Sequence, residues 1–257
     1  MNVVGYLLNT KDGLIGDRGM AYDYVIAKNG VFVESEGKYL AARVPVALAA
    51  RSFYGTEIRG LEPTGTTITL RYGKIPAYIF NLAISHLMGD RKNERFAAVT
   101  FAGGYHVNVP EQTGKQAHVE YAVPENVVLD LHSHPTFSMA FSGIDDADEQ
   151  GFHLYGVLAE VDSEMPTLHL RVGVYGYWSP IKLADIVDGE VPGILDGYEN
   201  DMAEGLEDDW EEKFAARIIE YSILRIRALE SLSRPSIVKR TNWTKSSSIT
   251  IYISPLI

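Results

Sequence analysis

The chain has 257 residues, 46% of them hydrophobic, which is enough for a substantial core in one or two domains. It contains no cysteine, which excludes a disulfide framework, thiol proteases and the His/Cys/Cys zinc site of nucleobase deaminases. The formal net charge of −11 argues against a dedicated nucleic-acid binder, which normally carries a basic face. The first residues do not read as a signal peptide, and no apolar run approaches the ~20 residues of a membrane span. We therefore expect a cytoplasmic protein with no membrane partner.

Residues 1–72 are predicted to form an N-terminal β-rich region. Asn29-Gly30 separates two apolar runs and is a strong hairpin signal. We expect strands at 3–8, 22–27, 31–34, 38–41 and 66–72, and a short helix at 46–53. No catalytic motif occurs in this region, which we interpret as a support or a surface for partner contact.

Residues 73–190 are predicted to form an α/β (α+β) domain with a mixed or mainly antiparallel sheet flanked by helices. Apolar residues fall at helical spacing between Pro76 and Leu87, with the proline in the first turn, where it is tolerated. We expect a second, acidic helix at 145–150 and strands at 94–101, 105–109, 116–123, 127–133, 154–161 and 168–175.

Residues 191–257 are predicted to contain a long C-terminal helix and a basic tail. From Met202 to Leu232 the apolar residues form one helical stripe, beginning with Leu206, Trp210, Phe214 and Ile218. After Leu232 the tail has four basic residues and no acidic one. These cations could contact an acidic partner or the acidic surface of the protein itself.

The candidate chemistry lies where an apolar strand ends. His132 and His134 close the strand predicted at 127–133, and side chains at i and i+2 share one face of a strand. Both imidazoles can therefore reach one point, where Asp145 could add a carboxylate. Two His and one carboxylate with an open fourth position make up many hydrolytic zinc sites. Zinc lowers the pKa of water in that position to roughly 7, and Glu94, on the preceding strand, is the best candidate for the general base.

Each of these residues also has an ordinary structural interpretation. Ser142-x-x-Asp145 is the outline of a helix-capping box, and the two roles are compatible because an acid at a helix start can still face a metal. Ser142 could also donate a hydrogen bond to an oxyanion. Glu94 alone would be an ordinary solvated residue after a turn. Asp146, Asp148 and Glu149 are interpreted as acids that favour the start of a helix.

The motif resembles a known family. The signature of the JAMM (MPN+, JAB) metalloproteases resembles the run His132-Ser133-His134-Pro135 together with Ser142-Gly143-Ile144-Asp145, with six residues between the two. The upstream element of that family resembles Glu94-Arg95-Phe96. The resemblance covers about residues 73–180. It implies a JAB/MPN-like (cytidine-deaminase-like) fold, Zn²⁺ bound by His132, His134 and Asp145, Glu94 as general base and Ser142 as the oxyanion stabiliser.

The resemblance also implies an activity, namely hydrolysis of isopeptide or peptide bonds after ubiquitin or a ubiquitin-like protein. The run from Ser142 to Glu149 is more specifically similar to the bacterial JAB proteins called PRTRC system protein A, which are encoded beside E1-like, E2-like and ubiquitin-like proteins. These are the expected partners. The alternative is a catalytically silent MPN-type scaffold, but such modules usually lose a ligand, and this sequence keeps the whole set.

Overall fold

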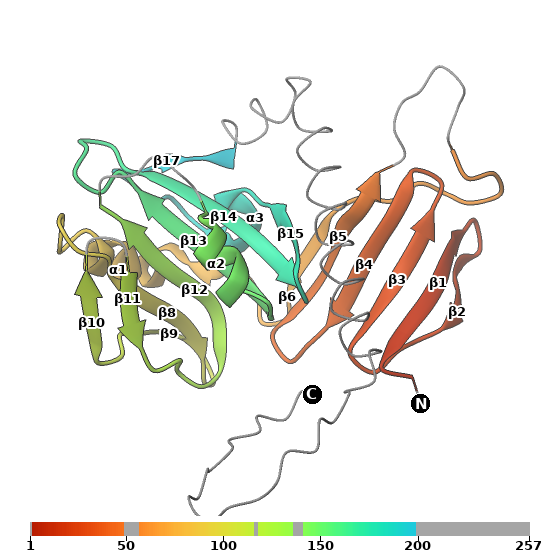
Figure 1. Cartoon of the computed structure of the whole chain (residues 1–257), viewed down its shortest axis with the longest axis horizontal. Helices are drawn as coiled ribbons and strands as arrows, with labels where there is room; N and C mark the ends of the chain where they lie inside the picture. Colours follow the sequence, from red (N-terminus) through yellow and green to blue (C-terminus); the bar gives the residue numbers. More distant parts are fainter. Residues whose placement is uncertain (1, 49–56, 116–117, 136–140, 199–257) are drawn as a thin grey trace, which may run out of the picture. The chain divides into compact units, whose positions relative to one another are not determined.

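The N-terminal region is one six-stranded sheet in the computed structural model, which describes residues 2–48, 57–115, 118–135 and 141–198 (Figure 1). The strand order is β2-β1-β3-β4-β5-β6. The β1–β3 pair is parallel and the other pairs are antiparallel. The strands are β1 (Val4–Thr10), β2 (Gly13–Asp17), β3 (Tyr22–Ala27), β4 (Gly30–Glu36), β5 (Leu40–Leu48) and β6 (Thr67–Leu70).

The predicted hairpin at Asn29-Gly30 is confirmed, since it joins β3 to β4. Gly30 has a φ of 144°, a conformation that favours glycine. The helix predicted at 46–53 is wrong for residues 46–48, and the rest of it lies outside the described residues. The reason is that β5 keeps pairing with β4 as far as Leu48, so ladder hydrogen bonds take the place of helical ones.

The second large sheet has the order β15-β14-β13-β12-β8-β9, with β17 (Leu195–Asp196) on β14. It is mixed, as predicted: β12–β13 and β14–β17 are parallel and the other pairs are antiparallel. Its other strands are β8 (Phe96–Phe101), β9 (Tyr105–Asn108), β12 (Val127–His134), β13 (Phe152–Ala159), β14 (Thr167–Val174) and β15 (Tyr177–Pro180).

The two faces of this sheet carry different side chains. Helix α1 (Ala77–Leu87), which was predicted from Pro76, buries Phe80, Ile84 and Leu87 in the same apolar cluster as Leu129 and Leu131 of β12. Successive side chains of a strand point to opposite faces. Asp130, His132 and His134 therefore lie on the face away from α1, where the short helix α2 (Gly143–Asp148) is found (Figure 1).

Smaller elements complete the described part of the chain. They are a hairpin of β10 (Gln112–Lys115) and β11 (His118–Tyr121), a parallel pair of β7 (Ile75–Pro76) and β16 (Val187–Asp188), and helix α3 (Leu183–Ile186). The strands dominate and the helices are few, which confirms the α+β class. None of the described helices is long and apolar enough to cross a membrane.

The two large sheets share one hydrophobic core. Val33 and Val44 of the N-terminal sheet belong to the same buried cluster as Leu129 and Leu154 of the central sheet. Strand β5 contacts β14 and β15, and the Tyr24 and Tyr177 hydroxyls are hydrogen-bonded at 2.9 Å. The domain boundaries after residues 72 and 190 stay predictions, and the predicted C-terminal helix and tail lie outside the described residues.

Candidate metal centre

Strand β12 presents both histidines at its end. His132 and His134 are one pleat apart, and their Nε2 atoms lie 3.2 Å from each other. On one side β12 pairs with β8, where Phe96 faces His132, and on the other with β13. The backbone that carries the two imidazoles is therefore fixed by ladder hydrogen bonds on both sides of β12. The expectation that they reach one point is met.

Helix α2 brings Asp145 to the histidines. Its Oδ1 atom lies 3.2 Å from His132 Nε2, and its Oδ2 atom lies 3.7 Å from His134 Nε2. The predicted capping box is confirmed: Ser142 Oγ accepts the N–H of Asp145 at 3.3 Å, and Asp145 Oδ2 accepts the N–H of Ser142 at 2.6 Å. The helix starts at Gly143 rather than at 145, because Ser142 is the N-cap. The turn that starts the helix thus aims the carboxylate.

The donor set fits a tetrahedral divalent metal. One ligand atom each from His132, His134 and Asp145 can be chosen so that all lie within 4.8 Å of one another. In a tetrahedral zinc site with bonds of ~2.1 Å, neighbouring ligand atoms are about 3.4 Å apart. The 3.2 Å between the two Nε2 atoms and the 3.2 Å from His132 Nε2 to Asp145 Oδ1 lie close to that value, and the 3.7 Å from His134 Nε2 leads to the other oxygen of Asp145, Oδ2. These three residues can therefore hold a metal ion.

Glu94 lies beside this group, just before β8. It is 8% exposed, and its Oε1 atom is 3.9 Å from His134 Nε2. Its position is fixed on two sides, since its N–H donates to the carbonyl of Lys115 at 2.8 Å and the N–H of the next residue, Arg95, donates to Ser133 Oγ at 2.9 Å. Burial raises the pKa of Glu94 to about 7, with a smaller contribution from the Asp145 charge, while His132 acts in the opposite direction. The carboxyl is thus close to half-ionised near neutral pH in the metal-free chain.

The charged groups of the site shift the pKa values of one another. Burial tends to lower the pKa of His132, but the hydrogen bond and charge of Asp145 outweigh it and the pKa is raised. Burial tends to raise the pKa of Asp145, but its bonds to His132 and Ser142 together hold it well below the ordinary value. Without metal the two residues therefore favour an ion pair, in which the proton on His132 occupies the place that a cation could take.

Sequence reasoning missed a buried ionic cluster beside these ligands. Arg171 of β14 is 7% exposed and bonds both Asp146 and Glu149 of the α2 region. The interpretation of Asp146 and Glu149 as acids that only favour the helix start is therefore incomplete. Asp130 was also missed: it lies on the same face as His132, its buried Oδ1 atom has no hydrogen-bond partner among the residues that the structure describes, and burial raises its pKa to about 7. An acid two residues before His132 on the same strand face was the one available signal.

No protein-family model matches the chain, and no curated protein matches it. The identification of the site therefore depends on the geometry above and on the sequence motif.

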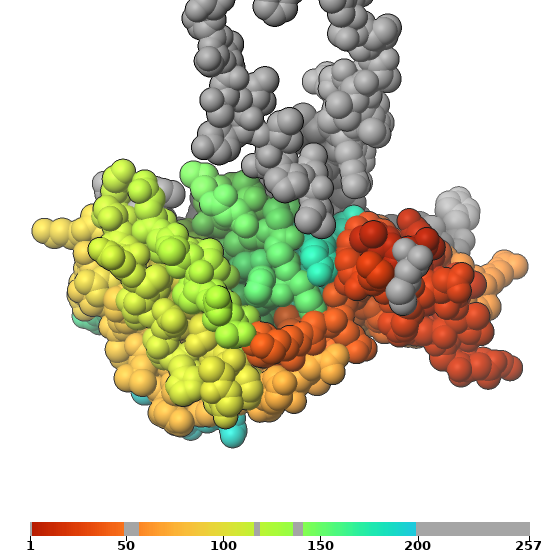
Figure 2. Space-filling model, turned by 90° about the horizontal axis from the view of Figure 1, so that it is seen from below, coloured from red at the N-terminus to blue at the C-terminus, as the bar shows by residue number. Residues whose placement is uncertain are grey.

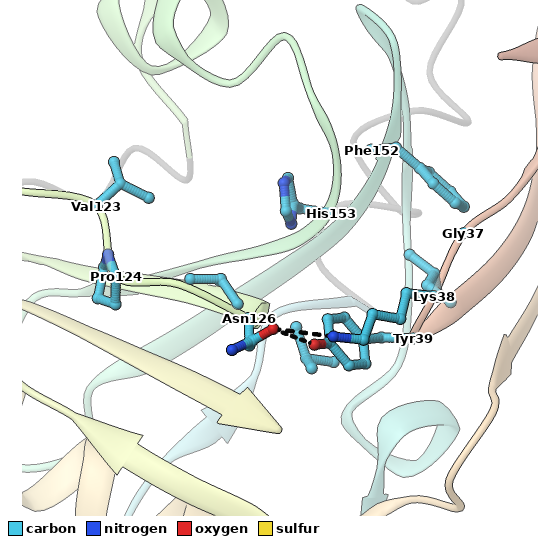
Figure 3. A pocket seen from close by; sticks show the side chains of 11 residues that line it. Gly37, Lys38, Tyr39, Val123, Pro124, Asn126, Phe152 and His153 are labelled. Carbon is cyan, nitrogen blue, oxygen red and sulfur yellow. Dashed lines mark hydrogen bonds between the residues drawn. The ribbon is translucent and has the colours of Figure 1, made fainter. Parts of the chain in front are cut away.

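A separate hollow of about 390 Å³ lies at the other end of β12 (Figure 3). It is lined by Lys38, Tyr39, Asn126, Phe152 and His153, among others, and Lys38 Nζ and Tyr39 Oη both donate to Asn126 Oδ1. In Figure 2 the orange-red β4–β5 turn lies next to the yellow-green segment leading into β12. The part of β12 that lines this hollow is Val127 and Val128, which at ~3.3 Å per residue ends about 13 Å before His132, so the hollow is not part of the candidate metal centre.

Proposed function

We propose that the chain is a zinc-dependent metalloprotease of the JAMM type, an isopeptidase or peptidase that cleaves after a ubiquitin-like protein. The observation that carries the proposal is that one ligand atom each from His132, His134 and Asp145 lies within 4.8 Å of the others, with the Glu94 carboxylate 3.9 Å from His134 Nε2. The JAB/MPN-like fold is part of the same proposal. It is supported by a mixed sheet that carries α1 on one face, and the two histidine side chains of β12 and helix α2 on the other.

The chemistry of this proposal follows from the residues at the site. His132, His134 and Asp145 would hold the zinc ion, which would supply Lewis acidity toward the scissile carbonyl and water. Glu94 accepts a proton from the attacking water and passes it to the leaving amine; its buried carboxyl, 3.9 Å from His134 Nε2, is placed for both tasks. The Ser142 oxygen is an acceptor in the cap, so its own O–H can donate to the oxyanion of the tetrahedral intermediate.

The substrate class rests on the sequence motif. A ubiquitin-like protein or its conjugate is the proposed substrate, and E1-like and E2-like proteins of the same operon are the proposed partners. A silent MPN-type scaffold is the alternative function. What favours the enzyme is that the ligands, the capped serine and a buried carboxyl are all together at one site.

The test uses the full chain and separates metal binding from catalysis. Zinc per chain is measured by elemental analysis in the wild type and in His134→Ala, Glu94→Gln and His106→Ala, the last being an exposed histidine outside the site. We expect His134→Ala to lose zinc and His106→Ala to keep it. Glu94→Gln should keep zinc but lose cleavage of a fusion between a ubiquitin-like protein and a reporter, by about 10²–10⁴-fold.

Each result has a clear meaning. Full zinc content in His134→Ala would overturn the ligand assignment. Undiminished cleavage by Glu94→Gln would place the general base elsewhere. A zinc-loaded wild type that leaves every such fusion intact would favour the scaffold over the enzyme.

A further inference from the structure

Helix α2 is attached to the sheet without apolar packing. It has 6 residues and buries none of them, and Ile144 is 61% exposed. Short helices are unstable alone and normally depend on a buried apolar face. The capping box orders the first turn of α2, but it does not tie the helix to the sheet. Besides the contact of Asp145 with His132 itself, bonds from other parts of the sheet can therefore help to fix the distance between Asp145 and the histidines.

Arg171 makes that contact from β14. Its Nη1 atom donates to Asp146 Oδ1 at 2.6 Å, and its Nε and Nη2 atoms donate to Glu149 Oε2 at 2.9 Å and 2.6 Å. The guanidinium thus holds one acid in the first turn of α2 and the C-cap residue of the same helix. Its side chain is 8% exposed and those of the two acids are 15% and 12% exposed, so solvent screens these pairs little.

Aromatic side chains hold the guanidinium in place. Its Cζ atom is 3.7 Å from the centroid of the Phe141 ring and 4.8 Å from that of Trp178. Phe141 directly precedes the N-cap Ser142, and Trp178 Nε1 donates to the carbonyl of Glu149 at 3.0 Å. The planar guanidinium suits stacking and forked hydrogen bonds at the same time, which a lysine ammonium cannot reproduce.

The sheet register links this cluster to the ligand strand. Arg171 lies opposite Tyr155 of β13, and Tyr155 lies opposite Asp130 of β12. Opposite residues share a face, and so do residues two apart in one strand. Arg171 and His132 therefore project from the same face of three hydrogen-bonded strands. Strand β12 carries the histidines, and β14 carries the arginine that holds α2. Together with β13 between them, these strands form one rigid support.

We propose that Arg171 is the positioning residue of the metal centre: by holding Asp146 and Glu149 it sets α2, and thereby the Asp145 carboxylate, at ligand distance from His132 and His134. The inference rests on the proposed metal site and adds a residue that touches neither metal nor substrate. Supporting partners behind metal ligands typically contribute 10–100-fold to metal affinity. Loss of Arg171 should weaken binding by an amount in that range while leaving all three ligands intact.

The test is a Co²⁺ titration of the metal-free full chain against a competing chelator. We expect Arg171→Lys to bind Co²⁺ about 10–100-fold more weakly than the wild type and to change the d–d absorption band, because one oxygen ligand is displaced. The matched control is Arg43→Lys. Arg43 is also a largely buried arginine, with a side chain 17% exposed and a bond of 2.8 Å to Glu34, but it lies in the N-terminal sheet. It should keep wild-type affinity and spectrum, even if its thermal stability falls.

The thermal unfolding of each metal-free variant is recorded to separate folding from binding. If Arg171→Lys does not fold, Glu149→Gln carries the test, since it removes one charge of the cluster and keeps the side-chain shape. Weaker binding and an altered band in a cooperatively folding variant support the proposal.

Two results would overturn it in different ways. If His134→Ala loses Co²⁺ but both cluster variants bind it as the wild type does, the positioning role is wrong and the metal site stands. If His134→Ala binds Co²⁺ as the wild type does, the metal site is wrong and the role of Arg171 falls with it.

Discussion

Ser142 and Asp145 each accept a hydrogen bond from the backbone N–H of the other, and the remaining oxygen of Asp145 lies 3.2 Å from His132 Nε2. A capping box normally only starts a helix. Here it also restricts the rotamer of a candidate metal ligand, because the oxygen held by the Ser142 N–H fixes where the other one points. One carboxylate can therefore serve both as a helix cap and as a ligand of the proposed metal.

The two roles of Ser142 can be separated by two substitutions. Ser142→Ala should lower the stability of the metal-free chain by about 1 kcal/mol, whereas Ser142→Gly should cost only a few tenths, because glycine is a tolerated N-cap. Both remove the hydroxyl, so both should lower kcat by about 10²–10³-fold if it stabilises the oxyanion. Chemical denaturation and cleavage of the ubiquitin-like fusion measure the two effects. Wild-type kcat in Ser142→Gly would leave Ser142 with capping alone.

The pH dependence of cleavage should report Glu94. A general base works only when ionised, so kcat/KM should rise by about tenfold per pH unit below its pKa and level off above it. Burial raises that pKa to about 7 in the chain without metal, and a bound cation favours the carboxylate and lowers it. The plateau should therefore begin at or below pH 7 in a profile from pH 5 to 9. A profile that still rises above pH 8 would assign the controlling group to another residue.

Burial of Glu94 should also cost the metal-free chain stability at high pH. The pKa of Glu94 is about 7 in the folded chain and 4.5 ordinarily, so between these values the folded state holds a proton that the unfolded state releases. Stability from this group therefore falls as pH rises through that window. Glu94→Gln should raise the Tm at pH 8 by roughly 2 °C or more, equivalent to about 1 kcal/mol, and change it little at pH 4.5. Glu125→Gln, at an exposed glutamate, is the control in the same chelator-treated series, and an equal gain there would contradict the explanation.

The β10–β11 hairpin should control Glu94 through the backbone. A Cβ atom at Gly114 would lie 2.2 Å from the carbonyl oxygen of Glu94, so Gly114→Ala must push the hairpin away. The Glu94 N–H would then lose its bond to Lys115, and the carboxylate would shift from the histidines. We expect cleavage to fall about tenfold or more with zinc content unchanged, at a stability cost of about 1–3 kcal/mol. Gly65→Ala, where a Cβ meets nothing within 4 Å, should have no effect, and normal cleavage by Gly114→Ala would show that the hairpin does not position Glu94.

Much of the site could be predicted because its signals are local. The period of two on an apolar strand places His132 and His134 on one face, and the spacing of Ser142 and Asp145 specifies a capped helix start. Glu94 is different. Its sequence surroundings are those of a solvated residue, and its burial depends on the pairing of β8 with β12, so the sequence indicated it only through its place on the strand before the histidines and through the family resemblance.

The rest could not be predicted because it depends on contacts between distant segments. Arg171 stands in the run Leu168-His169-Leu170-Arg171-Val172, where a single cation on a strand has no special signal. Its partners Asp146 and Glu149 lie more than twenty residues away, in a helix whose start also favours acids. Strands β2 and β10 were missed for a related reason: Gly13–Asp17 and Gln112–Lys115 are rich in turn-forming or polar residues, and it is pairing with a neighbour that makes them strands.

Because of the shared core, the region that carries the candidate site is a poor choice for transfer as a separate domain. A chain cut after residue 72 would leave the apolar surface around Leu129 and Leu154 without Val33, Val44 and their neighbours, and Tyr177 without its hydroxyl partner. Such a fragment should aggregate when expressed alone. Recombination or protein engineering that seeks to transplant the His-x-His site must therefore carry the N-terminal sheet with it, even though the described strands of that sheet contribute no residue to the candidate site.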